Sequence, residues 1–131
     1  MGKRIIETKN APAPIGPYNQ AVIVNGLLYM SGQIAIEPSS GELILNTIEE
    51  ETLQVMENIK AILHEAGCTF DDVVKCSIFI SDMGNFSEIN KIYGSYFSGL
   101  FPARECVEVS VLPKNVNVEI SVIAGLPSSD Q

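Results

Sequence analysis

The sequence predicts an α+β fold, in which a six-stranded mixed sheet carries two helices on one face. A tight hairpin is indicated by Asn25-Gly26, which separates two short apolar runs. Two longer segments repeat apolar side chains every three or four positions, as amphipathic helices do: residues 48–66 and 86–97. Three segments alternate apolar and polar side chains, as half-buried strands do: residues 73–80, 104–111 and 116–125. With a short first strand at residues 3–8, the predicted order is βββαβαββ.

The length and composition are those of one compact domain covering residues 1–131. A hydrophobic fraction of 46% beside a charged fraction of 18% indicates a rather apolar surface, which favours self-association. No apolar run approaches the roughly 20 residues that span a bilayer, and the N-terminal segment lacks the apolar region of a signal peptide. We therefore expect a soluble cytoplasmic protein that does not enter membranes.

The charge and the cysteines exclude two further classes of site. A formal net charge of −8 argues against a nucleic-acid groove, because neutralising phosphates dominates such binding. Three cysteines with no C-x-x-C spacing, beside a single histidine, do not suit a zinc site. They are typical of reduced thiols in a cytosolic protein, and we expect neither a metal nor a cofactor.

The first part of the chain leads to a hairpin through a proline-rich loop. The first strand should lie at a sheet edge, and the loop Asn10–Gln20 follows it. Tyr18 near the loop's end is either an aromatic anchor for the loop or the wall of a pocket. The hairpin strands are Ala21–Val24 and Leu27–Ser31, and Gly32 follows the second. A glycine there indicates a bulge, or a close approach of the backbone to a ligand or to another chain.

The two helices have recognisable start signals. Thr47 and Glu50 fit a capping box that opens the first helix, which closes at Gly67. The acidic run Glu49–Glu51 is interpreted as a solvated helix start, and His64, near the other end, is given a structural role. Asn85 repeats the cap pattern before a second helix that runs to about Phe97. Within it, Asn90 either faces solvent or reaches over the sheet edge into a pocket.

The connections restrict the strand order. Strand Val73–Ile80, the second helix and strand Arg104–Val111 form a β-α-β unit, so those strands should be parallel. If the last two strands formed a hairpin, Glu108 would face Glu119, and like charges opposite each other are destabilising. We therefore expect the last strand to insert beside Val73–Ile80, at the centre of the sheet.

A candidate site is indicated by charged side chains rooted in strands. Val107, Val109 and Val111 share one face of their strand, and the other face carries Arg104, Cys106, Glu108 and Ser110. Glu119 lies on the polar face of the last strand. A guanidinium held this rigidly could bind a small anionic substrate while the carboxylate handles a proton. An ordinary ion pair on a solvated sheet face would give the same pattern.

Several runs occur in order along nearly the whole chain: Ile15-Gly16-Pro17-Tyr18, Ser31-Gly32-Gln33, Phe101-Pro102-Ala103-Arg104, Cys106-Val107-Glu108-Val109, Leu112-Pro113 and Val118-Glu119-Ile120. Together they resemble the RidA family, the YjgF-like enamine/imine deaminases whose older names include L-PSP endoribonuclease and translation inhibitor. The resemblance implies a chorismate-mutase-like fold and a homotrimer with three clefts between subunits. It also implies hydrolysis of 2-imino acids, such as 2-iminobutanoate and 2-iminopropanoate, to 2-oxo acids and ammonia.

The resemblance implies a role for each site residue. Arg104 would clamp the substrate carboxylate, Glu119 would orient or activate water, and Cys106 would line the pocket as a third member of the catalytic group. The cleft wall would be completed by further substrate-binding residues: Tyr18, Ser31, Gly32 and Asn90. An imine carbon is already electrophilic, so the chemistry needs no metal, and Cys106 is the weaker candidate for a covalent nucleophile.

One residue departs from the family pattern. Between Arg104 and Cys106 the family carries a small residue, and here it is Glu105. Strand alternation directs Glu105 away from Arg104, whereas a bulge would turn it inward to compete for the guanidinium. Two other functions stay open: an endoribonuclease or translation inhibitor, and a non-catalytic protein that binds small acids as a sensor or in a chaperone-like role.

Overall fold

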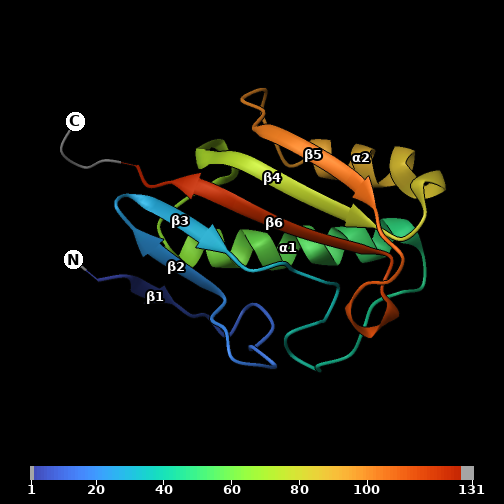
Figure 1. The fold of residues 1–131 in the computed structure, drawn as a ribbon, viewed down its shortest axis with the longest axis horizontal. Coiled ribbons are helices and arrows are strands. Elements are labelled where there is room, and N and C mark those ends of the chain that lie inside the picture. The colour runs from blue at the N-terminus through green and yellow to red at the C-terminus, as the bar shows by residue number, and fades with distance from the viewer. Residues whose placement is uncertain (1, 128–131) are drawn as a thin grey trace.

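A computed structural model describes residues 2–127 and has the predicted order of elements. The sheet contains six strands, with one helix between β3 and β4 and another between β4 and β5 (Figure 1). The elements are β1 Arg4–Ile6, β2 Ala21–Val24, β3 Leu27–Met30, α1 Ile48–Glu65, β4 Val73–Ile80, α2 Phe86–Gly94, β5 Ala103–Glu108 and β6 Val118–Gly125. The predicted α+β fold is thereby confirmed.

The last strand lies inside the sheet. The strand order is β1-β2-β3-β6-β4-β5, so β6 pairs antiparallel with both β3 and β4. β4 and β5 are parallel, as the β-α-β unit required, and β1 is an edge strand. Asn25 and Gly26 both have positive φ angles, 53° and 78°, which the predicted hairpin turn demands. The central insertion of the last strand is confirmed.

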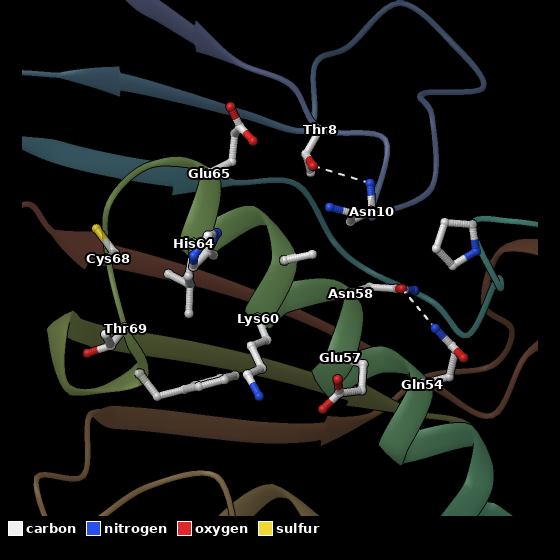
Figure 2. A pocket seen from close by; sticks show the side chains of 14 residues that line it. Thr8, Asn10, Gln54, Glu57, Asn58, Lys60, His64, Glu65, Cys68 and Thr69 are labelled. Carbon is white, nitrogen blue, oxygen red and sulfur yellow. Dashed lines mark hydrogen bonds between the residues drawn. The ribbon is translucent and has the colours of Figure 1, made fainter.

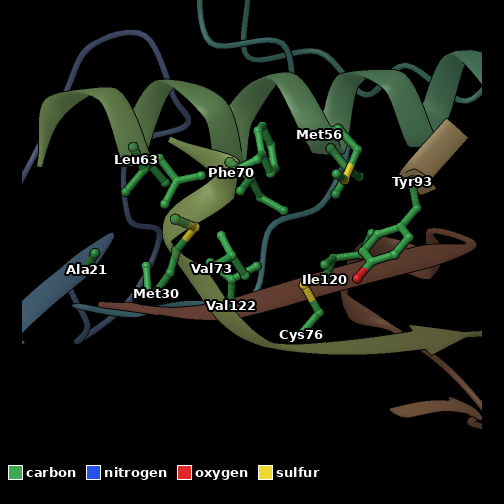
Figure 3. Packing of buried hydrophobic residues seen from close by; sticks show 14 of the residues in the cluster. Ala21, Met30, Met56, Leu63, Phe70, Val73, Cys76, Tyr93, Ile120 and Val122 are labelled. Carbon is green, nitrogen blue, oxygen red and sulfur yellow. The ribbon is translucent and has the colours of Figure 1, made fainter. Parts of the chain in front are cut away.

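The sheet has a helix face and an open face. Along β6 buried and partly exposed residues alternate strictly, and the buried set packs beneath the helices: Val118, Ile120, Val122 and Ala124. From α1 come Met56 and Leu63, and from α2 Tyr93 (Figure 3). Both helices lie on this one side of the sheet (Figure 1). Glu119 and Ile123 consequently belong to the open face, which the described residues leave uncovered by any helix.

The fifth strand directs its valine side to the open face and not to the face that the helices cover. Val107 is 41% exposed because it belongs to the open face, and Val111 is 65% exposed because β5 ends at Glu108, three residues before the predicted end of the strand. A second difference occurs in β4, where a register shift between Val73 and Lys75 turns Val74 out to 50% exposure. Val73 takes the buried position that the sequence pattern gives to Val74.

The start of α1 agrees with the sequence, and that of α2 does not. The Thr47 hydroxyl oxygen accepts a hydrogen bond from the Glu50 N–H at 3.0 Å, as the cap predicted. Asn85 makes no side-chain cap. Instead, Asp82 accepts from the Gly84 N–H at 2.9 Å and opens a short 3₁₀ turn that leads into α2. The second helix then ends at Gly94, one turn before Phe97.

Glu51 is not part of a solvated helix start. Its side chain is fully buried and its carboxylate accepts hydrogen bonds from the Asn117 N–H at 2.7 Å and the Asn117 amide at 2.8 Å. The Val118 N–H lies 3.3 Å from the same carboxylate. Glu51 therefore fastens the first turn of α1 to the start of β6, since a buried carboxylate must have its lone pairs satisfied.

Candidate functional site

Arg104 projects from the edge strand β5 toward α2. It pairs in register with Cys76 of β4, whose side chain is buried beneath the helices, so Arg104 lies on the helix face. Its Nη1 donates a hydrogen bond of 2.6 Å to Asn90 Oδ1. No other hydrogen bond is made by this guanidinium within residues 2–127, so most of its five N–H groups are free to bind a ligand.

One face of α2 surrounds the guanidinium. Phe86, Asn90 and Tyr93 are four and three residues apart, which places them on one side of a helix. The Arg104 Cζ lies 5.5 Å from the centre of the Phe86 ring and 5.2 Å from that of Tyr93. Both distances are within the range of cation–π attraction. The helix thus supplies one hydrogen bond and two aromatic contacts to a single charge.

A cleft of about 460 Å³ opens at this position, and its lining includes Phe101 and Pro102 as well as Asn90, Tyr93 and Arg104. Cys106, two residues along β5, is half-buried on the same face. Burial raises the pKa of its thiol, and the nearby Arg104 offsets only part of that rise. The thiol is therefore a poor source of thiolate, in line with a lining role.

Glu119 occupies a second, smaller pocket on the open face. Glu119 of β6 pairs with Phe79 of the neighbouring strand β4. Its pocket has a volume of about 70 Å³ and is also lined by Tyr18, Gly32 and Gln33. The carboxylate accepts no hydrogen bond from the part of the chain that the structure describes. Its half-buried position raises its pKa above the usual value. A carboxylate with free lone pairs and a raised pKa is suited to handling a proton.

Gly32 leaves the space that this carboxylate fills. A Cβ atom on Gly32 would lie 2.6 Å from Glu119 Oε2 and 2.8 Å from Cδ, closer than such atoms approach in proteins. Gly32 follows β3, and the adjoining Gln33 N–H donates a 2.8 Å hydrogen bond to the Ile120 carbonyl of β6. The close approach expected at this glycine is therefore to a side chain of its own chain.

Tyr18 and Ser31 lie beside this second pocket. The Tyr18 hydroxyl oxygen accepts a hydrogen bond from the Ile15 N–H at 3.2 Å, which folds the proline-rich loop back on itself. The Ser31 hydroxyl donates to the Asn19 carbonyl at 2.6 Å. Both side chains thus stabilise the loop, and Tyr18 also forms part of the Glu119 pocket.

The candidate residues therefore form two groups on opposite faces of the sheet. The helix-face group contains Arg104, Asn90 and Cys106, and the open-face group contains Glu119, Gly32 and Tyr18. The sequence led us to expect Arg104 and Glu119 around one small ligand, and within a single chain the sheet separates them. Each group contains three of the seven predicted residues, and Ser31 belongs to neither.

Glu105 does not compete for Arg104. It points to the open face, where its carboxylate lies 3.0 Å from Lys75 Nζ and accepts a hydrogen bond from the Ser77 hydroxyl. These two contacts lower the pKa of the Glu105 carboxyl. Glu105 therefore leaves the Arg104 guanidinium free, although it departs from the family pattern.

A groove of about 640 Å³ along the outer surface of α1 contains none of the candidate site residues (Figure 2). His64, Lys60 and Glu57 line it as exposed helix side chains. Its buried polar residue, Asn58, uses its amide on the Ile34 and Ile36 carbonyls. Its side-chain oxygen accepts from Gln54, so Asn58 has no group left for a ligand. Among residues 2–127, no three His, Cys, Asp or Glu side chains are grouped to hold a metal ion.

The sequence did not indicate that Tyr93 and Phe86 lie beside Arg104; it predicted only apolar helix positions for them. Their spacing from Asn90 was the available signal, because three residues on one helix face share the same neighbours.

Comparison with known proteins supplies the family. The sequence profile of the family described as endoribonuclease L-PSP matches residues 8–126. The chain belongs to this family, the RidA family. It is 47% identical over 122 residues to the 2-iminobutanoate/2-iminopropanoate deaminase of Capra hircus, covering 93% of this chain and 89% of that protein.

Two solved structures show the same RidA-family fold. The Rid-family protein YyfA of Yersinia pestis, a protein of unknown function, is 56% identical, with a TM-score of 0.93 over 95% of this chain and 100% of that one. Escherichia coli TdcF with bound serine is 38% identical, with a TM-score of 0.90 over 95% of this chain and 99% of that one. Family members thus include a named deaminase and a protein that binds a small amino acid. Over residues 2–127, no helix has both the length and the apolar composition needed to cross a membrane.

Proposed function

We propose that this RidA-family chain hydrolyses the C=N bond of small 2-imino acids, 2-iminobutanoate and 2-iminopropanoate among them, to 2-oxo acids and ammonia. The observation that carries the proposal is the state of Arg104, whose guanidinium is held by α2 and keeps most of its N–H groups free in a cleft. Two parallel N–H groups match a carboxylate. Because Asn90 accepts with its oxygen, its amide NH₂ is left to donate to the same ligand.

The carboxylate of Glu119 completes the chemistry. Water adds to the carbon of the protonated imine as Glu119 takes a proton from it, which gives a carbinolamine bearing hydroxyl and amino groups. That proton then passes from Glu119 to the nitrogen, the C–N bond breaks and ammonia leaves, while the hydroxyl proton returns to the Glu119 carboxylate as the C=O bond forms. Cys106 forms no bond in this scheme, which accords with the raised pKa of its thiol. Orienting the water is the main contribution required of the protein.

A shared site would bring the two groups of residues together. In the proposed homotrimer, Arg104 of one chain and Glu119 of a neighbour border the same cleft. The exposed apolar side chains of the open face support such an assembly, because a monomer rarely leaves such side chains uncovered; they include Tyr29 and Val107. We assign the activity to the cytoplasm, where the free thiols of Cys68, Cys76 and Cys106 are kept reduced.

The test generates 2-iminobutanoate in place with a threonine dehydratase and follows the imine by trapping. Added protein should shorten the lifetime of the imine, and Arg104→Ala should abolish this effect. Arg4→Ala is the matched control, because Arg4 is an exposed arginine on the edge strand β1 and lines none of these pockets. An imine lifetime unaffected by the wild-type protein would refute the proposal. Binding of 2-oxobutanoate without such an effect would instead support a non-catalytic binding protein.

A further inference from the structure

Tyr93 connects the guanidinium of Arg104 to the core. Its side chain is only 4% exposed, its ring lies 5.2 Å from the Arg104 Cζ, and its hydroxyl lies beside the Cys76 thiol. Figure 3 shows the hydroxyl directed at the Cys76 sulfur. The ring is therefore fixed at both ends, one in the cleft and one in the core.

The residue at the inner end is the strand neighbour of Arg104. Cys76 of β4 and Arg104 of β5 are partners in the parallel register, and both side chains are on the helix face. Tyr93 thus contacts the guanidinium of Arg104 at one end and Cys76, the strand partner of Arg104, at the other. Phe86, about two turns earlier on the same face of α2, offers a second ring, whose centre lies 5.5 Å from the Arg104 Cζ.

An arginine side chain is long and flexible, and ordering it reduces the free energy that a ligand gains. The Asn90 hydrogen bond alone leaves the guanidinium free to rotate about that contact. Ring faces on α2 restrict this rotation, because the cation is attracted to the face and not to the edge of an aromatic ring.

We propose that Tyr93, assisted by Phe86, is a positioning residue that holds the Arg104 guanidinium ready for a carboxylate. The inference rests on the proposed function for the identity of the ligand, but the order of Arg104 in the free protein does not depend on that function. Tyr93 acts through Arg104 and forms no bond with the reacting atoms.

The test has two readouts. The first is the NMR signal of the Arg104 Nε–H group in the ligand-free protein, whose ring-current shift is measured against the exposed Arg4. The second is the dissociation constant for 2-oxobutanoate, measured by calorimetry. In Tyr93→Leu the ring-current shift should fall to what the Phe86 ring alone gives, and binding should weaken about tenfold. In Tyr93→Phe, which keeps the ring and loses the hydroxyl, most of the shift should remain.

Two further variants separate an effect on the stability of the fold from an effect on the position of Arg104. Ile62→Val removes a buried methylene group from α1 without touching Arg104, and it should leave both readouts unchanged. Phe86→Leu tests the second ring and serves if Tyr93→Leu does not fold. Wild-type values of both readouts in the ring-deleted variants, or equal weakening in Ile62→Val, would overturn the proposal. A wild-type protein that neither binds 2-oxobutanoate nor shortens the imine lifetime would refute the proposed function, while the Arg104 signal would still decide the role of Tyr93.

Discussion

Gly32 and Glu119 are in such close contact that a single methyl group on the glycine would displace the carboxylate, since it would lie 2.6 Å from Oε2. The two residues come from different parts of the chain and meet because β3 and β6 are neighbours in the sheet. The position of the proposed proton acceptor is therefore set by the absence of a side chain.

Gly32→Ala should consequently impair both folding and activity. The added Cβ overpacks the contact, which typically costs about 1–3 kcal/mol of unfolding free energy, and it pushes Glu119 out of its pocket. Urea unfolding and the imine-lifetime assay measure the two effects. Gly125→Ala is the matched control, because a Cβ on Gly125 of β6 would meet nothing within 4 Å.

The same contact predicts a coupling between the two positions. Shortening Glu119 to alanine in the Gly32→Ala background removes the atoms that clash, so the double variant should regain most of the lost unfolding free energy. Additive losses in the double-mutant cycle would show that the methyl group acts elsewhere.

Glu119→Gln should lower activity at least about a hundredfold, because general base catalysis is lost, yet it should not lower stability at pH 7. Burial raises the pKa of this carboxyl, so the folded chain holds its proton more tightly than the unfolded chain. Its contribution to stability is present below the unfolded pKa and is lost as the pH rises through the folded pKa. Thermal unfolding of both proteins should show that the melting temperature of the variant, relative to that of the wild type, rises between pH 4 and pH 7.

The raised pKa also predicts the pH dependence of the wild-type reaction. The reaction needs the carboxylate form, so activity should fall on the acid side at a pH above the ordinary range of a glutamate. This acid limb should disappear from the residual activity of Glu119→Gln. A limb that persists in the variant would assign the titration to another group.

Glu51→Gln should destabilise the fold. The amide replaces one acceptor oxygen with a donor that faces the N–H groups of Asn117 and Val118, and a buried unpaired donor costs about 1–3 kcal/mol. Urea unfolding measures the loss. Glu65→Gln, an exposed glutamate at the other end of the same helix, should change the unfolding free energy by less than about 0.5 kcal/mol.

Arg104→Ala and Glu119→Ala should complement each other when the two chains are co-expressed. If the cleft lies between copies, roughly one site in four of a one-to-one mixture pairs an intact Arg104 with an intact Glu119. The mixed protein should then be active although each variant alone is not. Light scattering should give a trimer for all three preparations, and an inactive mixed trimer would argue against shared clefts.

The fold could be predicted because some of its signals are local and another rules out an alternative strand pairing. Asn25-Gly26 determines its hairpin through backbone conformation alone, and the repulsion expected between Glu108 and Glu119 indicated the central insertion of the last strand. Where prediction was wrong, a distant partner decided the outcome. Glu51 looked like any first-turn acid, and it is buried because Asn117, 66 positions away, lies against it.

The site was harder to predict for a related reason. Strand alternation states which residues share a face, but not which face the helices cover. The valines of β5 suggested that their own side was covered, yet it is the open face that is apolar here, and Arg104 lies beneath α2. Tyr93 was overlooked because a side chain that belongs to the core and also touches the cleft has the sequence pattern of the core.

The position of β6 also has a consequence for biosynthesis. The strand that joins the two halves of the sheet is the last of the six to be synthesised, so until then β3 and β4 each have an unpaired edge. A premature stop codon before Val118 would therefore remove the strand that pairs with both, and the sheet could not form as one unit.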